Sequence, residues 1–257
     1  MQQYILVSLS KNGFFKEAQF HGGTFLKIIH NLKRFSEDLD FVLKDENPQF
    51  KWQLILENVK KDLTNDGIDF DIIDKSKFEG AIQKTFIKTN SIGKILHINL
   101  PYSRHQYKKI KIKLEIDCIP PKGSKFETHY INFPITVPIT TQTLASGFAG
   151  KIHALLCRNY TKGRDWYDYI WYISKNTKVN MNLLKNALFQ QGPWKGEKIT
   201  LTEKWLEEVF VQKINSIDWK EATEDVSRFL PLGEQSSLEY WNKKLFLYHL
   251  KKIKFNF

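Results

Sequence analysis

The stretch Phe20–Phe41, FHGGTFLKIIHNLKRFSEDLDF, constrains the fold more strongly than any other part of the chain. A Gly-Gly pair is followed by apolar residues at the spacing of one helix face, which predicts a short helix packed on a sheet. These apolar residues are Phe25, Ile28, Ile29 and Leu32. An Asp-Leu-Asp triplet comes next, and side chains two residues apart in a strand point to the same face. Asp38 and Asp40 are therefore expected to share one face of a strand.

This order of features indicates a site for a nucleoside triphosphate and its metal ions. Gly22 and Gly23 permit a close approach of the backbone to a ligand, and the N–H groups that begin a helix attract anions. Two neighbouring carboxylates repel each other, and a Mg²⁺ ion, usually held by one or two carboxylates together with phosphates, relieves that repulsion. A Gly-Gly pair alone is usually an ordinary turn, and an isolated Asp-x-Asp is usually a solvated edge. Their combination in one local unit is more specific.

A run of strands is expected in the first half of the chain. Ile110 to Cys118 alternates apolar and polar residues, which predicts a strand with one buried face. Further strands are expected at residues 18–21, 68–73, 81–88 and 94–100, and helices at residues 4–18 and 52–63. Strands linked by short turns predict a mixed or antiparallel sheet, unlike the parallel sheet of a doubly wound fold.

The polar face of the long strand carries Lys113, Glu115 and Asp117. If this strand neighbours the strand of Asp38 and Asp40, one or two of its acids complete a three-acid metal cluster. The register of the two strands decides between Glu115 and Asp117, and the pattern leaves both open. On spacing alone the three residues are the solvated face of a sheet.

Helical periodicity dominates after residue 140. Helices are expected at residues 143–158 and 165–174, and two capping boxes mark later helix starts. The boxes pair Asp218 with Glu221 and Ser236 with Glu239. Three tryptophans of this region are expected in its core, and they are Trp205, Trp219 and Trp241. The chain is thus expected to be α+β, with a sheet domain at residues 1–140 and a helical domain at residues 141–257.

Composition narrows the choice of partner and compartment. Of the 257 residues, 39 are Lys or Arg and 28 are Asp or Glu, a net charge of +11 that favours a polyanion such as nucleic acid. A Lys-rich genome would give the same excess without a partner. The two cysteines, Cys118 and Cys157, lie far apart and predict no disulfide framework. Neither a signal peptide nor a membrane span is recognisable, so a cytoplasmic protein with no membrane partner is expected.

Three segments carry a resemblance to a known family. The first is Gly22-Gly23-Thr24 with the downstream RFSEDLDF of Arg34–Phe41, the second is KLEIDCIPP of Lys113–Pro121, and the third is AGKIHALLCR of Ala149–Arg158 with KGRDWYD of Lys162–Asp168. In this order they resemble the nucleotidyltransferase toxins of the AbiEii/AbiGii type, in the DNA polymerase β-like superfamily. The resemblance is close over residues 15–175 and loose in the tail.

The resemblance implies a polymerase β-like catalytic domain and assigns roles to particular residues. The implied catalytic residues are Asp38, Asp40, Glu115, Asp117, Lys151 and Asp165. The four acids among them on the two strands, Asp38, Asp40, Glu115 and Asp117, are the implied metal ligands. The implied nucleotide-binding residues are Gly22, Gly23, Thr24, Ser36 and Arg158.

The residues themselves leave alternatives to several of these roles. Lys151, contributed by the helical domain with Asp165, is expected to offset charge on the leaving oxygens, although spacing alone makes it a solvated helix lysine. Asp165 also suits a helix N-cap or first turn, and its helix is expected to bury one face while its acidic face looks the other way. Ser36 either contacts phosphate or ends a helix turn. His153 is expected to be structural.

The implied reaction is transfer of a nucleoside monophosphate from an NTP to an RNA acceptor, with Mg²⁺ (Mn²⁺ as an alternative) and release of pyrophosphate. The 3′ end of tRNA is the expected acceptor, and a separately encoded antitoxin is the expected protein partner. One alternative keeps the chemistry but changes the acceptor to a small molecule or a protein hydroxyl. The other alternative is a non-catalytic nucleotide-binding or RNA-binding module.

Overall fold

The computed structural model describes residues 1–74, 91–99 and 109–256 of the chain. The strand expected at residues 81–88 lies outside the described residues, as does Leu100. The chain forms two compact units. The first consists of Met1–His30, Glu37–Pro120 and Phe126–Thr141, and the second of Asn31–Ser36, Pro121–Lys125 and Gln142–Phe257. Each unit is therefore assembled from segments that are not contiguous in the sequence.

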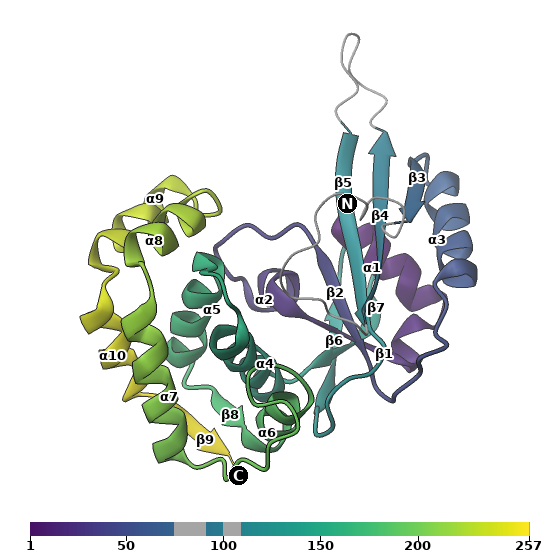
Figure 1. Cartoon of the computed structure of the whole chain (residues 1–257). Helices are drawn as coiled ribbons and strands as arrows, with labels where there is room; N and C mark the ends of the chain where they lie inside the picture. The colour runs from purple at the N-terminus through teal and green to yellow at the C-terminus, as the bar shows by residue number, and fades with distance from the viewer. Residues whose placement is uncertain (75–90, 100–108, 257) are drawn as a thin grey trace. The chain divides into compact units, whose positions relative to one another are not determined.

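The first unit is built on a mixed sheet, which confirms the expected class of fold. Its seven described strands have the order β3-β4-β5-β2-β1-β7-β6. Their bounds are β1 Ala18–His21, β2 Leu39–Leu43, β3 Asp69–Asp74, β4 Ser91–Asn99, β5 Lys109–Asp117, β6 Phe126–Ile131 and β7 Val137–Gln142. The pairs β1–β2, β3–β4 and β4–β5 are antiparallel, whereas β1–β7 and β2–β5 are parallel. Figure 1 shows β2 and β5 side by side within this sheet.

One face of the sheet is apolar because β5 alternates as its sequence predicts. Ile112, Leu114 and Ile116 are buried there. On the neighbouring strand β2, the ring of Phe41 contacts that of Phe14 on the same apolar side, with ring centroids 4.9 Å apart. On the opposite face of β5, Lys111 is exposed and Lys113, Glu115 and Asp117 are half-buried, so that face is not covered as the apolar face is.

Besides the helix that follows β1, the described part of the first unit contains three helical segments. They are α1 Gln2–Lys11, the short 3-10 helix η1 Phe14–Lys16, and α3 Gln53–Asn65. The helices α1 and α3 contact each other. Trp52, which precedes α3, stacks on the Phe14 ring at 5.3 Å. Aromatic packing therefore ties η1 and the start of α3 to the buried side of the sheet.

The helix α2, Gly22–His30, follows β1 without an intervening turn. The sequence predicts a Gly-Gly turn before this helix, but the helix begins at Gly22 itself, with φ at +80°. A residue with positive φ lets the chain leave the strand and enter the helix in one step, and glycine does so without a Cβ penalty.

The second unit is mainly helical. Its elements are α4 Leu144–Cys157, α5 Gly163–Ser174, β8 Lys178–Asn180, α6 Met181–Gln190, α7 Glu203–Ser216, α8 Trp219–Ser227, α9 Leu232–Gln235, the 3-10 helix η3 Ser236–Tyr240, α10 Lys243–Leu250 and β9 Lys254–Asn256. The Thr143 side chain accepts the Ser146 N–H at the start of α4. The two short strands β8 and β9 pair in parallel.

One of the two expected capping boxes is correct and the other is wrong. Asp218 caps α8 and accepts the N–H groups of Lys220 and Glu221. Ser236 begins η3, a 3-10 helix preceded by Gln235 with no side-chain cap. The box pattern at Ser236 fails because α9 ends at the preceding residue, so no new α-helix starts there.

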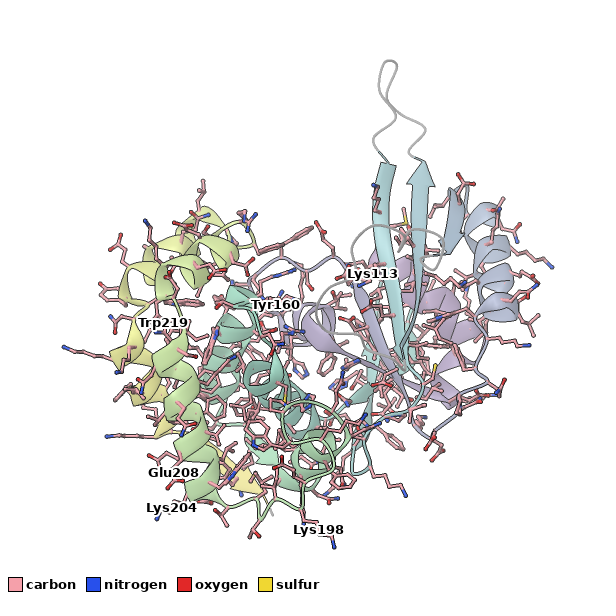
Figure 2. The ribbon with its side chains drawn as sticks, in the orientation of Figure 1. Lys113, Tyr160, Lys198, Lys204, Glu208 and Trp219 are labelled. Atoms are coloured by element: carbon pink, nitrogen blue, oxygen red, sulfur yellow. The ribbon has the colours of Figure 1, made fainter. Side chains whose placement is uncertain are left out.

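Aromatic side chains form the core of the helical unit. Trp219, labelled in Figure 2 at the start of α8, stacks on Phe246 with ring centroids 3.9 Å apart. Trp166 meets both rings edge-on. Trp241 is buried, as expected, whereas Trp205 and Trp219 are half-buried. No helix in the described part of the chain has the length and apolar composition needed to cross a membrane.

Candidate active site

The register of β2 and β5 selects between the two acids that the sequence leaves open. In this parallel pair Asp40 lies opposite Glu115, and Val42 lies opposite Asp117. Register partners on adjacent strands present their side chains on the same face. The Glu115 carboxylate is therefore the neighbour of Asp40, while Asp117 is displaced by two residues along the strand. Asp38 precedes β2 by one residue and keeps the alternation of Asp40.

Asp117 already has a structural partner at the end of β5. Its Oδ1 accepts the N–H of Ile119 at 3.1 Å, which stabilises the turn after the strand. Within residues 1–74, 91–99 and 109–256, no group of three or more His, Cys, Asp or Glu side chains is arranged to hold a metal ion. The structure thus brings Asp40 and Glu115 together and does not close a three-acid cluster around a cation.

A pair of carboxylates nevertheless fits Mg²⁺ in kind and number. This ion is commonly held by one or two carboxylates and by the phosphates of its substrate, with water in the remaining positions. Asp38, Asp40 and Glu115 are half-buried, so none of the three is enclosed in the core. These residues can hold Mg²⁺ that arrives with a nucleotide.

A lysine lies among these acids. Lys113, labelled on β5 in Figure 2, forms an ion pair with Glu115. Its side chain is 29% exposed and that of Glu115 is 18% exposed. Burial lowers the pKa of Lys113, but the hydrogen bond to Glu115 and the charges of Glu115, Asp38 and Asp40 outweigh burial and raise the pKa overall. The acids and this lysine therefore form one electrostatic group.

The start of α2 lies against the same group. A Cβ added to Gly22 would fall 2.7 Å from Oδ2 of Asp40, closer than real Cβ contacts. Glycine is thus required here both by the positive φ and by the approach of the Asp40 carboxylate. The first N–H groups of α2, those of Gly22 and Gly23, have no partner within the helix and favour anions.

Thr24 is engaged in a structural contact. Its buried hydroxyl donates to the carbonyl oxygen of Asp38 and so ties α2 to the residue that enters β2. The expected role of Thr24 in nucleotide binding therefore rests on its backbone N–H and not on its hydroxyl.

The helical unit contains a second charged group, buried and arranged around Asp168. Arg34 binds this carboxylate with two parallel hydrogen bonds, from Nε to Oδ1 at 2.6 Å and from Nη2 to Oδ2 at 2.7 Å. The Asp168 side chain is 0% exposed and that of Arg34 is 4% exposed. Bidentate pairs of this kind are strong and geometrically specific.

Lys151 and Arg158, both placed by α4, complete the group. The Lys151 Nζ lies 2.7 Å from Oδ1 of Asp165 and 2.8 Å from Oδ2 of Asp168. Arg158 pairs with the other oxygen of Asp165. The sequence predicts that the acidic face of α5 looks away from the packed part of the unit. That prediction is wrong, because the side chains of Asp165 and Asp168 are both buried. Both faces of α5 are covered, one by aromatic rings and one by cations.

These contacts shift the ionisation of the buried groups. Burial raises the pKa of Asp168, but the charges and hydrogen bonds of Arg34 and Lys151 outweigh burial and bring the pKa to about 2. Burial lowers the pKa of Lys151, with the Arg34 and Arg158 cations acting in the same direction and Asp168 opposing them. Asp168 is thus anionic at neutral pH, and its charge is compensated within the unit.

The remaining candidate residues are also placed by the helical unit. Ser36 is buried within the short segment Asn31–Ser36. His153 contacts the carbonyl oxygen of Gln191 through Nε2 at 3.0 Å, a contact of the kind expected for a structural histidine. Sequence reasoning did not identify the Arg34–Asp168 pair, because 134 residues separate the partners and no local pattern links them.

Comparison with known families shows that the chain is a nucleotidyltransferase. The chain belongs to the family of nucleotidyl transferase AbiEii toxins of type IV toxin–antitoxin systems, whose family model matches residues 4–245. This confirms the resemblance seen in the three sequence segments.

Two solved structures from Helicobacter pylori have a similar fold. A presumed nucleotidyltransferase is 17% identical, with a TM-score of 0.50 over 99% of this chain and 96% of that chain. JHP933 is 18% identical, with a TM-score of 0.50 over 97% of this chain and 92% of that chain. No curated protein matches the chain at a significant level.

Proposed function

We propose that this toxin transfers a nucleoside monophosphate from an NTP to an RNA acceptor in a Mg²⁺-dependent reaction that releases pyrophosphate. The observation that carries the proposal is the placement of Asp40 opposite Glu115, with the start of α2 against the Asp40 carboxylate. Acids and unpaired N–H groups so arranged suit a cation and the phosphates it accompanies.

In this reaction Asp38, Asp40 and Glu115 hold the cation, and the N–H groups of Gly22 and Gly23 bind phosphate oxygens. The bound Mg²⁺ supplies charge neutralisation on the phosphates and a lower pKa for the attacking hydroxyl. Asp117 is proposed to be a weaker ligand of the cation, because its carboxylate already accepts the Ile119 N–H at the turn after β5.

Lys151 and Asp165 are proposed to be required for transfer, and Ser36 and Arg158 for nucleotide binding. The support for Lys151 is its environment, since a lysine held by two carboxylates has a fixed ammonium position. A fixed cation can offset charge that develops on phosphate oxygens at little cost in reorganisation.

The proposed acceptor is the 3′ end of a tRNA. The net charge of +11 supports a polyanionic acceptor, because phosphate neutralisation supplies affinity that decreases steeply with salt. We further propose that the reaction takes place in the cytoplasm, where NTP and tRNA are found, and that the antitoxin of the pair counteracts it.

The proposal is tested by incubating the protein with each α-labelled NTP, Mg²⁺ and total tRNA, and by repeating the reaction with Asp40→Asn. The exposed Asp45, close to Asp40 in sequence, provides a matched control as Asp45→Asn. Label is expected in tRNA with wild type and Asp45→Asn, and at least about a hundredfold less with Asp40→Asn. Label in a small molecule or a protein would replace the RNA acceptor, and label in no acceptor would overturn the proposal.

A further inference from the structure

We infer that Lys113 is a built-in counter-ion of the acid group, which competes with the divalent cation for the same carboxylates and so sets the metal affinity of the site. The inference rests on the proposed function, because it concerns the same three acids. Unlike the three acids, Lys113 does not bind the cation but lowers the affinity of the site for it.

The strand geometry places the Lys113 ammonium group beside the acids that are proposed to bind the cation. Lys113 and Glu115 are two residues apart on β5 and share one face of the strand. The ion pair between them occupies a carboxylate that lies opposite Asp40. The strands β2 and β5 run parallel, with Leu39 opposite Leu114. Asp38, the residue before Leu39, is therefore level with Lys113 along the sheet. The ammonium is thus paired with Glu115 and lies within electrostatic reach of Asp38 and Asp40.

The ammonium group and a divalent cation cannot both lie next to the same carboxylates, because they repel each other. An ammonium within a few ångströms of a doubly charged cation is repelled by it, and partial burial strengthens the repulsion relative to bulk water. In exchange, the lysine relieves the mutual repulsion of the three acids as long as no cation is bound. Lys113 must therefore move away from Glu115 when Mg²⁺ binds there.

An ordinary solvated lysine on the same strand provides the comparison. Lys111 belongs to the same alternating face, two residues before Lys113, and its side chain is exposed. A charge in that position is screened by solvent and salt, so its removal changes metal affinity little.

The test measures binding of Mn²⁺ alone, without nucleotide, to the full-length protein, by electron paramagnetic resonance of free Mn²⁺ and by the Mn²⁺-dependent rise in Tm. Lys113→Gln is expected to bind Mn²⁺ about tenfold more tightly than wild type. Lys113→Arg keeps the charge and is expected to retain wild-type affinity within about threefold, and Lys111→Gln within about twofold. Without Mn²⁺, the Tm of Lys113→Gln is expected to be lower than that of wild type.

The outcomes separate this inference from the proposed function. Equal or weaker Mn²⁺ binding by Lys113→Gln overturns the counter-ion role while leaving the metal site intact. Binding by wild type that Asp40→Asn does not reduce overturns the metal site itself. If Lys113→Gln is unfolded in the absence of Mn²⁺, its refolding midpoint in Mn²⁺ gives the same comparison with Lys113→Arg.

Discussion

Asp40 and Glu115 face each other across the parallel strands β2 and β5, although the two residues come from distant parts of the chain. The pairing of these strands, and not a local sequence motif, places the Asp-Leu-Asp triplet beside one particular acid of the long strand.

Glu115 and Asp117 are expected to differ in their importance for transfer. Glu115→Gln removes the acid beside Asp40 and is expected to lower the rate of NMP transfer by about 10²-fold or more. Asp117→Asn keeps an oxygen that can accept the Ile119 N–H and is expected to lower the rate by less than about tenfold. Initial rates at saturating NTP check this, and an equal loss in the two variants would contradict the assignment from register.

Gly22 is expected to be required both for its positive φ and for the close approach of Asp40. Gly67, which has a positive φ but no such neighbour, separates the two effects. Gly22→Ala and Gly67→Ala both place a Cβ at positive φ, which costs about 1–2 kcal/mol, but only at Gly22 does the Cβ meet another group, the Asp40 carboxylate. Both variants are expected to unfold at lower denaturant concentration, and Gly22→Ala alone is expected to lose Mn²⁺ affinity. Unchanged Mn²⁺ affinity in Gly22→Ala would show that the approach to Asp40 has no role in the site.

Lys151 is expected to be needed for the chemical step. Lys151→Met is expected to lower kcat for transfer by about 10²–10³-fold, as loss of one positioned cation does in comparable reactions. The exposed Lys185 on α6 gives the control Lys185→Met, which is expected to retain wild-type kcat. Because the change also removes a partner of Asp165 and Asp168, circular dichroism must show a folded variant, and a folded Lys151→Met with wild-type kcat would refute the role.

The Arg34–Asp168 pair is expected to give the helical unit an acid-sensitive stability. The pKa of Asp168 is lowered from 3.8 to about 2 in the folded state, so its contribution is fully present above about pH 4 and is lost as the pH falls toward 2. At pH 7, Arg34→Met is expected to cost about 3–5 kcal/mol, because it leaves a buried carboxylate with fewer partners.

The surface pair of Arg228 and Asp225 supplies the control for this prediction. The Arg228 side chain is 74% exposed, and Arg228→Met is expected to change the free energy of unfolding by less than about 1 kcal/mol. Urea unfolding at pH 7 and pH 3 measures both variants. The destabilisation caused by Arg34→Met should shrink at the lower pH, and a pH-independent value would argue against an ionic origin.

The elements with strong local patterns could be predicted from the sequence. The alternation of β5 and the side-chain cap of α8 at Asp218 both involve residues close together in the chain, so their physical cause is visible in the sequence. Strand β6 has no such signal, since five of its six residues are not buried and apolar alternation is lacking. The Ser236 box shows the opposite error, a capping pattern where no α-helix follows.

The candidate site was predictable in composition but not in arrangement. Asp38, Asp40 and Gly22 are identified by their local order, whereas the choice of Glu115 over Asp117 requires the register of β2 and β5. The positions of Lys113 and Arg34 could not be inferred either, because an ion pair depends on which side chains the fold brings together. Charged residues give no periodic signal that names their partners.

The short segment Asn31–Ser36 has a consequence for how the chain can be divided into fragments. It belongs to the helical unit, although the residues on both sides of it belong to the sheet unit. A fragment that ends at residue 141 would retain Arg34 but lack Asp168, the acid that compensates its charge. The fragment that begins at residue 142 would keep the buried Asp168 carboxylate without its arginine, so a cut at this point is expected to destabilise it.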